Sequence, residues 1–175
     1  PNKGFTHGGI FHADDVFSAA FLNIINGYHF KITRGFNPPT NDNKIIPDVL
    51  VFDIGGGKFD HHGIKETRNN GIPYAAFGKL WREYAKDAFG EYVANKVDSV
   101  FVQEIDAYDN GVEGSASNIS RFIHNLNPLW NEKTLSTDDA FASAVIIAEQ
   151  ILRREIEVAQ SVEGARDYVN IMLIS

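Results

Sequence analysis

The sequence predicts an α/β fold with a mostly parallel sheet and helices on both of its faces. A short apolar segment opens the chain, apolar residues then recur at helical spacing, and two further apolar segments follow. The order strand, helix, strand indicates parallel strands joined by a crossover helix. Ligands bind such sheets at the carboxyl ends of the strands. We therefore expect a functional site just after the predicted strands.

The first half of the chain supplies the predicted sheet. The expected elements are a strand over 4–7, a helix over 16–26, strands over 29–33 and 49–53, and a loop over 36–47. Gly27 suits the end of the helix, and the paired prolines Pro38-Pro39 support the loop.

After Pro73 the pattern becomes helical. Apolar spacing predicts helices over 74–89, 91–109, 117–126 and 137–162. Ser136 and Asp139 have the spacing of a capping box at the start of the last helix. The apolar face of that helix, which includes Phe141 and Leu152, predicts packing within the domain, and a homodimer is the alternative.

Composition limits the class of protein. With 175 residues, of which 43% are hydrophobic, the chain can bury one core, and we expect a single domain over 1–175. The net charge of −7 argues against a basic surface that binds nucleic acid, although metal ions can hold a phosphate-bearing substrate on an acidic protein. The chain contains no cysteine, so any metal must be bound through oxygen and nitrogen.

We expect no membrane segment, because the longest apolar stretch is shorter than the roughly 20 residues that span a bilayer. An intracellular location is the expectation, in the cytoplasm or in an organelle if the source is eukaryotic. The chain begins at Pro1 and ends in the apolar run 169–174, from which we expect a fragment of a longer protein.

Histidine and aspartate residues gather in groups after predicted strands or on a predicted helix. Carboxylate oxygen and imidazole nitrogen together suit a divalent ion such as manganese, zinc or iron, and an apolar core does not accommodate such groups in a row. The groups are His7, His12, Asp14 and Asp15; Asp53, Asp60, His61 and His62; and Asp106 and Asp109. Together they predict a dinuclear metal site.

Asp53 is the predicted bridge between two ions, because it ends a buried strand and precedes Gly55-Gly56-Gly57, which lets the backbone approach the site. The expected ligands are His7, His12 and Asp53 for one ion, and Asp14, Asp53, His61 and either Asp106 or Asp109 for the other. Three carboxylates leave two divalent ions with a net positive charge, which attracts a phosphate.

Three residues are candidates for catalytic roles. His62 could donate to a phosphate or protonate a leaving group, and Asp60 could orient a histidine; packing within the turn is the alternative for both. Asp15 lies in the first turn of a helix, where the dipole favours a carboxylate whatever the function, so structural and catalytic roles both stay open. We expect His29 and His124 to be packing or surface residues, and Arg34, Lys65 and Arg68 to be solvated.

These motifs resemble those of the DHH phosphoesterase superfamily, which is named for the Asp-His-His found here at 60–62. Within it the chain is similar to the melanocyte-proliferating-gene protein family of metal-dependent hydrolases and exonucleases. The similar stretches are residues 6–15, 51–56, 60–62, 104–111 and 126–131. The resemblance implies a parallel-sheet catalytic domain, two Mn²⁺-like ions and hydrolysis of a phosphodiester by a 3'-5' exonuclease, with RNA or short oligonucleotides as substrate.

The first motif departs from the superfamily pattern. Members usually carry His-x3-Asp-x-Asp, whereas this chain has His7-x4-His12-x-Asp14, so His12 replaces a carboxylate. The resemblance also implies a second, substrate-binding domain, which we expect this chain to lack. Mg²⁺, Zn²⁺ and Fe²⁺ are alternatives to Mn²⁺. Hydrolysis of pyrophosphate or small nucleotides, and metal binding without catalysis, are alternative functions.

Overall fold

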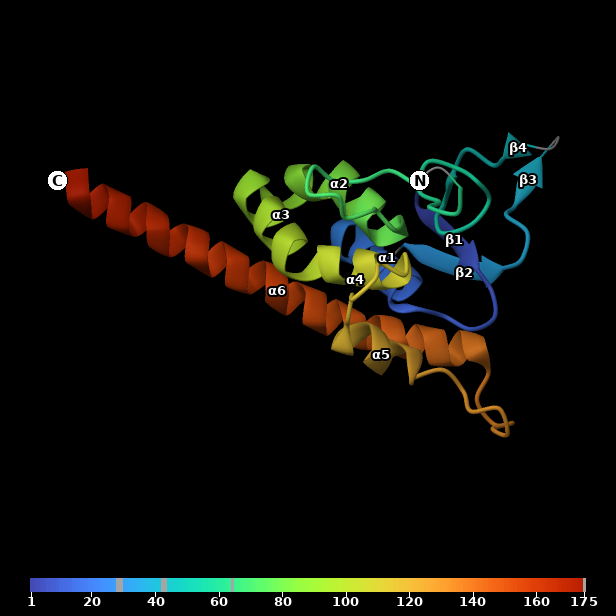
Figure 1. The fold of residues 1–175 in the computed structure, drawn as a ribbon. Coiled ribbons are helices and arrows are strands. Elements are labelled where there is room, and N and C mark those ends of the chain that lie inside the picture. Colours follow the sequence, from blue (N-terminus) through green and yellow to red (C-terminus); the bar gives the residue numbers. More distant parts are fainter. Residues whose placement is uncertain (28–29, 42–43, 64, 175) are drawn as a thin grey trace.

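Helices flank a small parallel sheet (Figure 1). In the computed structural model, which describes residues 1–27, 30–41, 44–63 and 65–174, this sheet has three strands in the order β2-β1-β5. Its strands are β1 (Lys3–His7), β2 (Lys31–Gly35) and β5 (Val49–Val51). Both neighbours of β1 run parallel to it. The predicted α/β class with a parallel sheet is therefore confirmed.

The helices pack largely around α1, which contacts α6, α2, α5 and α4. Their bounds are α1 (Ala13–Asn26), α2 (Ala76–Phe89), α3 (Glu91–Val97), the π-helical turn η1 (Asp98–Val102), α4 (Gln103–Asp109), α5 (Asn118–His124) and α6 (Thr137–Ile174). Residues 13–22 of α1 are all buried, since neighbouring elements cover this helix on every side.

Aromatic side chains form the centre of the core. Phe21 lies against Trp81, with 4.9 Å between the ring centroids, and Phe17 lies edge-on to Phe101 at 5.1 Å. These contacts join α1 to α2 and η1. Burial of such large rings stabilises the packing of these helices and thus fixes the elements that carry the site.

The long helix α6 begins as predicted and ends later than predicted. Ser136 Oγ accepts a hydrogen bond from Asp139 N at 3.1 Å, which confirms the cap, and Phe141 and Leu152 are buried against the domain. The predicted end at residue 162 is wrong, because α6 continues to Ile174 and its last part extends beyond the other elements (Figure 1). Loss of an apolar face does not stop a helix, since adding residues to an existing helix is far easier than starting one.

Other predicted elements differ from the structure in detail. The predicted loop 36–47 contains the short antiparallel strands β3 (Thr40–Asn41) and β4 (Lys44–Ile45). The bounds of the predicted helix 91–109 are confirmed, although the π-helical turn η1, a feature that apolar spacing alone does not reveal, lies within it. Strand β2 begins at Lys31, not at residue 29, and His29 lies outside the described residues.

Within the described part of the chain, no helix is both long enough and apolar enough to cross a membrane.

Candidate metal centre

The candidate site lies where β1 and β5 end. Phe5 of β1 pairs with Val51 of β5, so the residues two positions further on, His7 and Asp53, come side by side. They border a cavity of about 990 Å³ whose walls also include His61 and Asp109. This is the sheet edge at which the sequence predicted a site.

Asp53 occupies the centre of the site. Its side chain is only 4% exposed, and its two carboxylate oxygens face different histidines. Oδ2 lies 3.3 Å from Nε2 of His7, and Oδ1 lies 3.0 Å from Nε2 of His61. Burial alone would raise the pKa of Asp53, but the close contacts with the imidazoles of His61 and His7 outweigh it, so this pKa lies below its ordinary value.

The backbone at Asp53 has an uncommon conformation. Its φ angle is 56°, a left-handed value that aspartate tolerates better than most residues. Gly55 and Gly56 follow with φ angles of 88° and 70°, values that only glycine adopts readily. The chain thus turns sharply after β5 and brings the Asp60-His61-His62 segment back toward Asp53.

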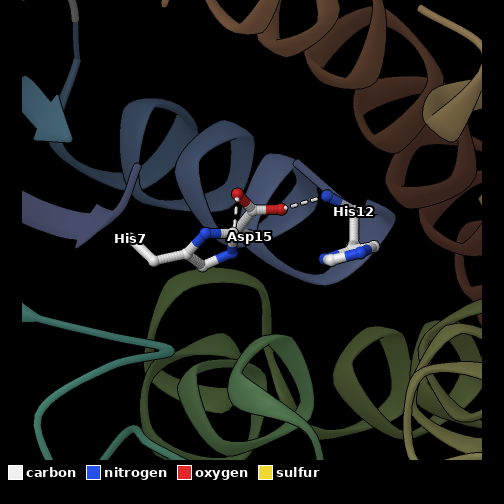
Figure 2. Close-up of side chains that lie close together, drawn as sticks. All are labelled: His7, His12 and Asp15. Carbon is white, nitrogen blue, oxygen red and sulfur yellow. Dashed lines mark hydrogen bonds and ion pairs between the residues drawn. The ribbon is translucent and has the colours of Figure 1, made fainter. Parts of the chain in front are cut away.

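On one side of Asp53, the residues His7, His12 and Asp15 form a first candidate ligand group. One possible ligand atom from each lies within 4.8 Å of the others. Figure 2 shows Asp15 between the two histidines: Oδ2 lies 3.3 Å from Nε2 of His7, and Oδ1 accepts a hydrogen bond from the backbone N–H of His12 at 2.8 Å. Asp15 therefore holds the first turn of α1 and the ring of His7 together.

The charges of this first group are linked. Burial lowers the pKa of His7, but the close contact with the Asp53 carboxylate and the charge of Asp15 outweigh it and raise this pKa to about 9. Burial also raises the pKa of Asp15 to about 7, although the charge of His7 opposes the change. In the absence of a cation, protons on these groups offset the buried negative charge.

On the other side of Asp53, the residues Asp14, His61 and Asp109 form a second group. Nε2 of His61 lies 3.2 Å from Oδ2 of Asp109 and 3.9 Å from Oδ2 of Asp14. Burial, together with the charge of Asp53, raises the pKa of Asp14 well above its ordinary value and that of Asp109 to about 6. These carboxylates lie close to one another, and a divalent cation would relieve their repulsion.

Asp14 has a second role in the fold. Its Oδ1 accepts a hydrogen bond from Phe77 N at 2.7 Å, and its Oδ2 accepts one from Ala76 N at 3.0 Å. These are the first residues of α2, so the carboxylate caps that helix from a distant part of the chain. The same side chain that faces His61 thus fixes the start of α2.

Asp106 and Asp109, the two alternatives for one predicted ligand, lie in different surroundings. Asp106 Oδ1 accepts a hydrogen bond from Gly78 N at 3.0 Å, and its Oδ2 lies 2.7 Å from the guanidinium of Arg68. A Cβ at position 78 would lie 1.8 Å from that oxygen, so the approach requires glycine. Among the described residues, the candidate ligand groups include Asp109 and do not include Asp106.

Asp60 and His62 lie at the open side of the site. The carboxylate of Asp60 accepts hydrogen bonds from Gly56 N at 2.7 Å, from His62 N at 2.9 Å and from His62 Nδ1 at 2.8 Å. The His62 side chain is 63% exposed and forms a third candidate group with Asp53 and His61. Burial would raise the pKa of Asp60, but the hydrogen bonds from His62 and Gly56 outweigh it and lower this pKa.

The donor set suits a divalent cation. In the described part of the chain, no lysine or arginine forms an ion pair with Asp14, Asp15, Asp53 or Asp109. Asp15 Oδ2 and Asp53 Oδ1 are buried and have no partner of full hydrogen-bond geometry, although imidazole nitrogens lie near them. Buried carboxylates are normally paired or bind metal, so these side chains could hold metal ions.

Sequence reasoning missed several residues of the cavity wall. His124 was expected to be a packing or surface residue, yet it borders the cavity and stacks near His12, with 6.0 Å between the ring centroids. Arg121 and Asn110 also line the cavity. These residues follow no apolar strand, and only the packing of α5 and α4 brings them to the site.

The expectation of solvated cations was wrong for two of three residues. Arg68 is buried and pairs with Asp98 at 2.7 Å as well as with Asp106. Arg34 pairs with Asp138 at 2.9 Å and donates to the carbonyl of Gly9 at 2.8 Å. Lys65 is exposed at the cavity wall, as expected. The partners of the two arginines are distant in sequence, so local pattern could not identify them.

The fold and the site define an α/β protein with a histidine and aspartate centre that could bind metal ions. The family model MYG1_exonuc, described as "Uncharacterised protein family (UPF0160)", matches residues 4–173. The chain therefore belongs to the MYG1 family.

Curated relatives carry the same family name. The MYG1 exonuclease of Mus musculus is 27% identical over 192 residues, which cover 88% of this chain and 50% of that protein. The MYG1 exonuclease of Homo sapiens has the same identity and coverage, 27%, 88% and 50%. The MYG1 protein YER156C of Saccharomyces cerevisiae is 30% identical over 174 residues, which cover 79% of this chain and 52% of that protein.

The chain spans about half the length of the curated relatives it matches. No solved structure gives a significant match to the chain.

Proposed function

We propose that this chain carries the active site of a metal-dependent phosphodiesterase that acts as a 3'-5' exonuclease on RNA or short oligonucleotides. The observation that carries the proposal is the position of Asp53, whose two carboxylate oxygens face His7 on one side and His61 on the other. A carboxylate whose two oxygens face different ligand groups could bridge the two ions of a two-metal hydrolase. The names of the relatives, which include MYG1 exonucleases, support the reaction class.

Each proposed ion has its own ligands besides the shared Asp53. His7 and His12 would hold one ion, with Asp15 as their support. Asp14, His61 and Asp109 would hold the other. Bound divalent ions would polarise the phosphoryl oxygens and lower the pKa of water, so that hydrolysis proceeds near neutral pH. We propose Mn²⁺ as the native ion, and membership of the DHH superfamily is part of this proposal.

His62 is the residue best placed to move a proton. Its Nδ1 bonds to Asp60, which leaves Nε2 for the cavity. An exposed imidazole held in this way can donate a proton to a leaving oxygen or a hydrogen bond to a phosphate. Asp60 orients the ring, and it also accepts the N–H of Gly56, which ties the histidine to the glycine turn.

The cavity wall supports a phosphate-bearing substrate. Lys65, Arg121 and His124 border the same cavity as the candidate ligands. In the described part of the chain, neither Lys65 nor Arg121 forms an ion pair with a carboxylate. Cations near a metal centre create a local positive field even though the whole chain has a net charge of −7.

The test is release of nucleotides from a short RNA labelled at its 5' end, with and without added Mn²⁺. We expect stepwise shortening from the 3' end that requires Mn²⁺. Asp53→Asn should lower the rate by more than the roughly 10–100-fold that is typical of changes around metal ligands. The matched control is Asp87→Asn, on the exposed surface of α2, which should leave the rate unchanged.

Other outcomes separate the alternative functions. Hydrolysis of inorganic pyrophosphate with no shortening of RNA would indicate a pyrophosphate or small-nucleotide substrate. Mn²⁺ binding that depends on Asp53, without hydrolysis of either compound, would indicate a metal-binding module and would contradict the proposed reaction.

A further inference from the structure

A buried lysine lies behind the Asp60-His61-His62 turn. Lys79 belongs to the first turn of α2, and its side chain is only 5% exposed. Removing an ammonium group from water is unfavourable unless the group is hydrogen-bonded. Lys86 on the same helix is exposed and pairs with Glu91, so helix formation does not require burial of a lysine. The buried position of Lys79 therefore calls for a local explanation.

The closest partner of the Lys79 ammonium is a backbone atom of the turn. Nζ donates a hydrogen bond to the carbonyl oxygen of Asp60 at 2.8 Å. Its second partner is Oε1 of Glu66 at 3.4 Å, on a half-exposed side chain that also pairs with Arg82 at 2.6 Å. The ammonium thus points inward to the turn, and its carboxylate partner lies toward the surface.

Asp60 is consequently held at both its main chain and its side chain. Its carboxylate already accepts hydrogen bonds from Gly56 N and from His62. The next residue along the chain is His61, whose Nε2 lies 3.0 Å from Asp53 and 3.2 Å from Asp109. A rotation of the peptide after Asp60 would move His61 away from both carboxylates.

The first turn of α2 is itself anchored to the site. Asp14, a candidate ligand, accepts hydrogen bonds from Ala76 N and Phe77 N. Lys79 extends from this turn to Asp60, and His61 then returns toward Asp14. These contacts connect Asp14, the first turn of α2 and the Asp60-His61-His62 turn to one another, and Lys79 provides the contact between α2 and that turn.

We infer that Lys79 is a positioning residue of the metal centre, which sets the Asp60-His61-His62 turn by holding the carbonyl of Asp60. The inference rests on the proposed metal site. It assigns to the buried ammonium the task of placing His61 opposite Asp14 and Asp109, and it gives no role in proton transfer to Lys79.

The experiment measures Mn²⁺ affinity by titration, with loss of the free-ion EPR signal as the readout. Lys79→Met removes the donor and keeps the apolar stem. We expect its Mn²⁺ affinity to fall by roughly 10–100-fold, as for other groups that orient metal ligands. Lys79→Arg keeps a donor and should restore most of the affinity. Lys86→Met is the matched control on the same helix and should bind Mn²⁺ as the parent does.

Thermal unfolding of the metal-free proteins shows which variants are folded. If Lys79→Met does not fold, Lys79→Gln takes its place, with the same expected loss of affinity. A folded Lys79→Met or Lys79→Gln variant that binds Mn²⁺ as tightly as the parent would overturn the inference. So would an equal loss of affinity in Lys86→Met. A parent protein that binds Mn²⁺ and does not hydrolyse RNA would overturn the proposed function and leave the role of Lys79 standing.

Discussion

The two sides of the candidate centre are built in different ways. The group His7, His12 and Asp15 comes from one continuous stretch, the end of β1 and the start of α1. The group Asp14, His61 and Asp109 comes from α1, the turn after β5 and the end of α4. The first side depends on local structure, whereas the second depends on how α2 and α4 pack. The comparison shows that adjacent aspartates can belong to different ligand groups, since Asp15 lies in the first group and Asp14 in the second.

The largest effect on stability is expected from Asp106→Asn, and its comparison with Asp109→Asn tests which of the two aspartates binds metal. Asp106→Asn removes one of the two carboxylates that pair with the buried Arg68. The protein should lose roughly 3 kcal/mol of stability, which is the lower end of the range for a broken buried ion pair. We expect the lower end because Asp98 still pairs with Arg68. Asp109→Asn should change the stability of the metal-free protein little and should weaken Mn²⁺ binding. Urea unfolding and Mn²⁺ titration measure the two effects, and equal destabilisation by both changes would contradict the assignment.

Asp14→Ala should affect both stability and metal binding. Loss of the cap on α2 should cost about 1–2 kcal/mol, and the second ion should bind more weakly. Ser136→Ala removes a different helix cap, that of α6, and Ser136 belongs to no candidate ligand group among the described residues. This control should lose a similar amount of stability and keep the Mn²⁺ affinity of the parent. Normal Mn²⁺ binding by Asp14→Ala would exclude Asp14 from the centre.

His12→Ala should remove one ion and keep the other. His12 belongs only to the first group, so we expect the number of bound Mn²⁺ ions per chain to fall from two to one. His124→Ala is the control, because its ring lies beside His12 and belongs to no candidate group among the described residues. Equilibrium dialysis with metal analysis gives the number of ions, and an unchanged number in His12→Ala would show that this ligand is wrong.

The smallest expected effect is a gradual dependence of metal affinity on pH. Without metal, the pKa of His7 is raised to about 9, that of Asp15 to about 7 and that of Asp109 to about 6. Ligands bind metal in their deprotonated forms, so Mn²⁺ must displace protons and its affinity should rise with pH over this range. Calorimetry in buffers of different ionisation enthalpy measures the released protons. An affinity that stays constant over this range would contradict the arrangement.

Local pattern was enough to predict the sheet and the edge at which most of the candidate ligands come together. The strands β1 and β5 are short apolar segments, and α1 has apolar residues at helical spacing, so their place in the chain could be read directly. His7 lies at the end of β1 and Asp53 lies shortly after β5, so both could be placed at the sheet edge from the sequence. The turn η1 and the extension of α6 leave no such signal, because neither changes the apolar spacing in a distinctive way.

The choice between Asp106 and Asp109 could not be made from the sequence. Both lie on one face of a helix, and both are carboxylates. What separates them is Arg68, a distant residue that pairs with Asp106 and leaves Asp109 for the cavity. The position of His124 at the cavity wall was missed for the same kind of reason, since only the packing of α5 brings it beside His12.

The most direct test of the central claim is a crystal structure with bound Mn²⁺, in which anomalous scattering locates the ions. The account predicts two peaks, one on each side of Asp53, separated by roughly 3.5–4 Å as in other two-metal sites. One peak belongs near His7 and His12, and the other near Asp14, His61 and Asp109. A single peak, or peaks that do not contact Asp53, would contradict the account.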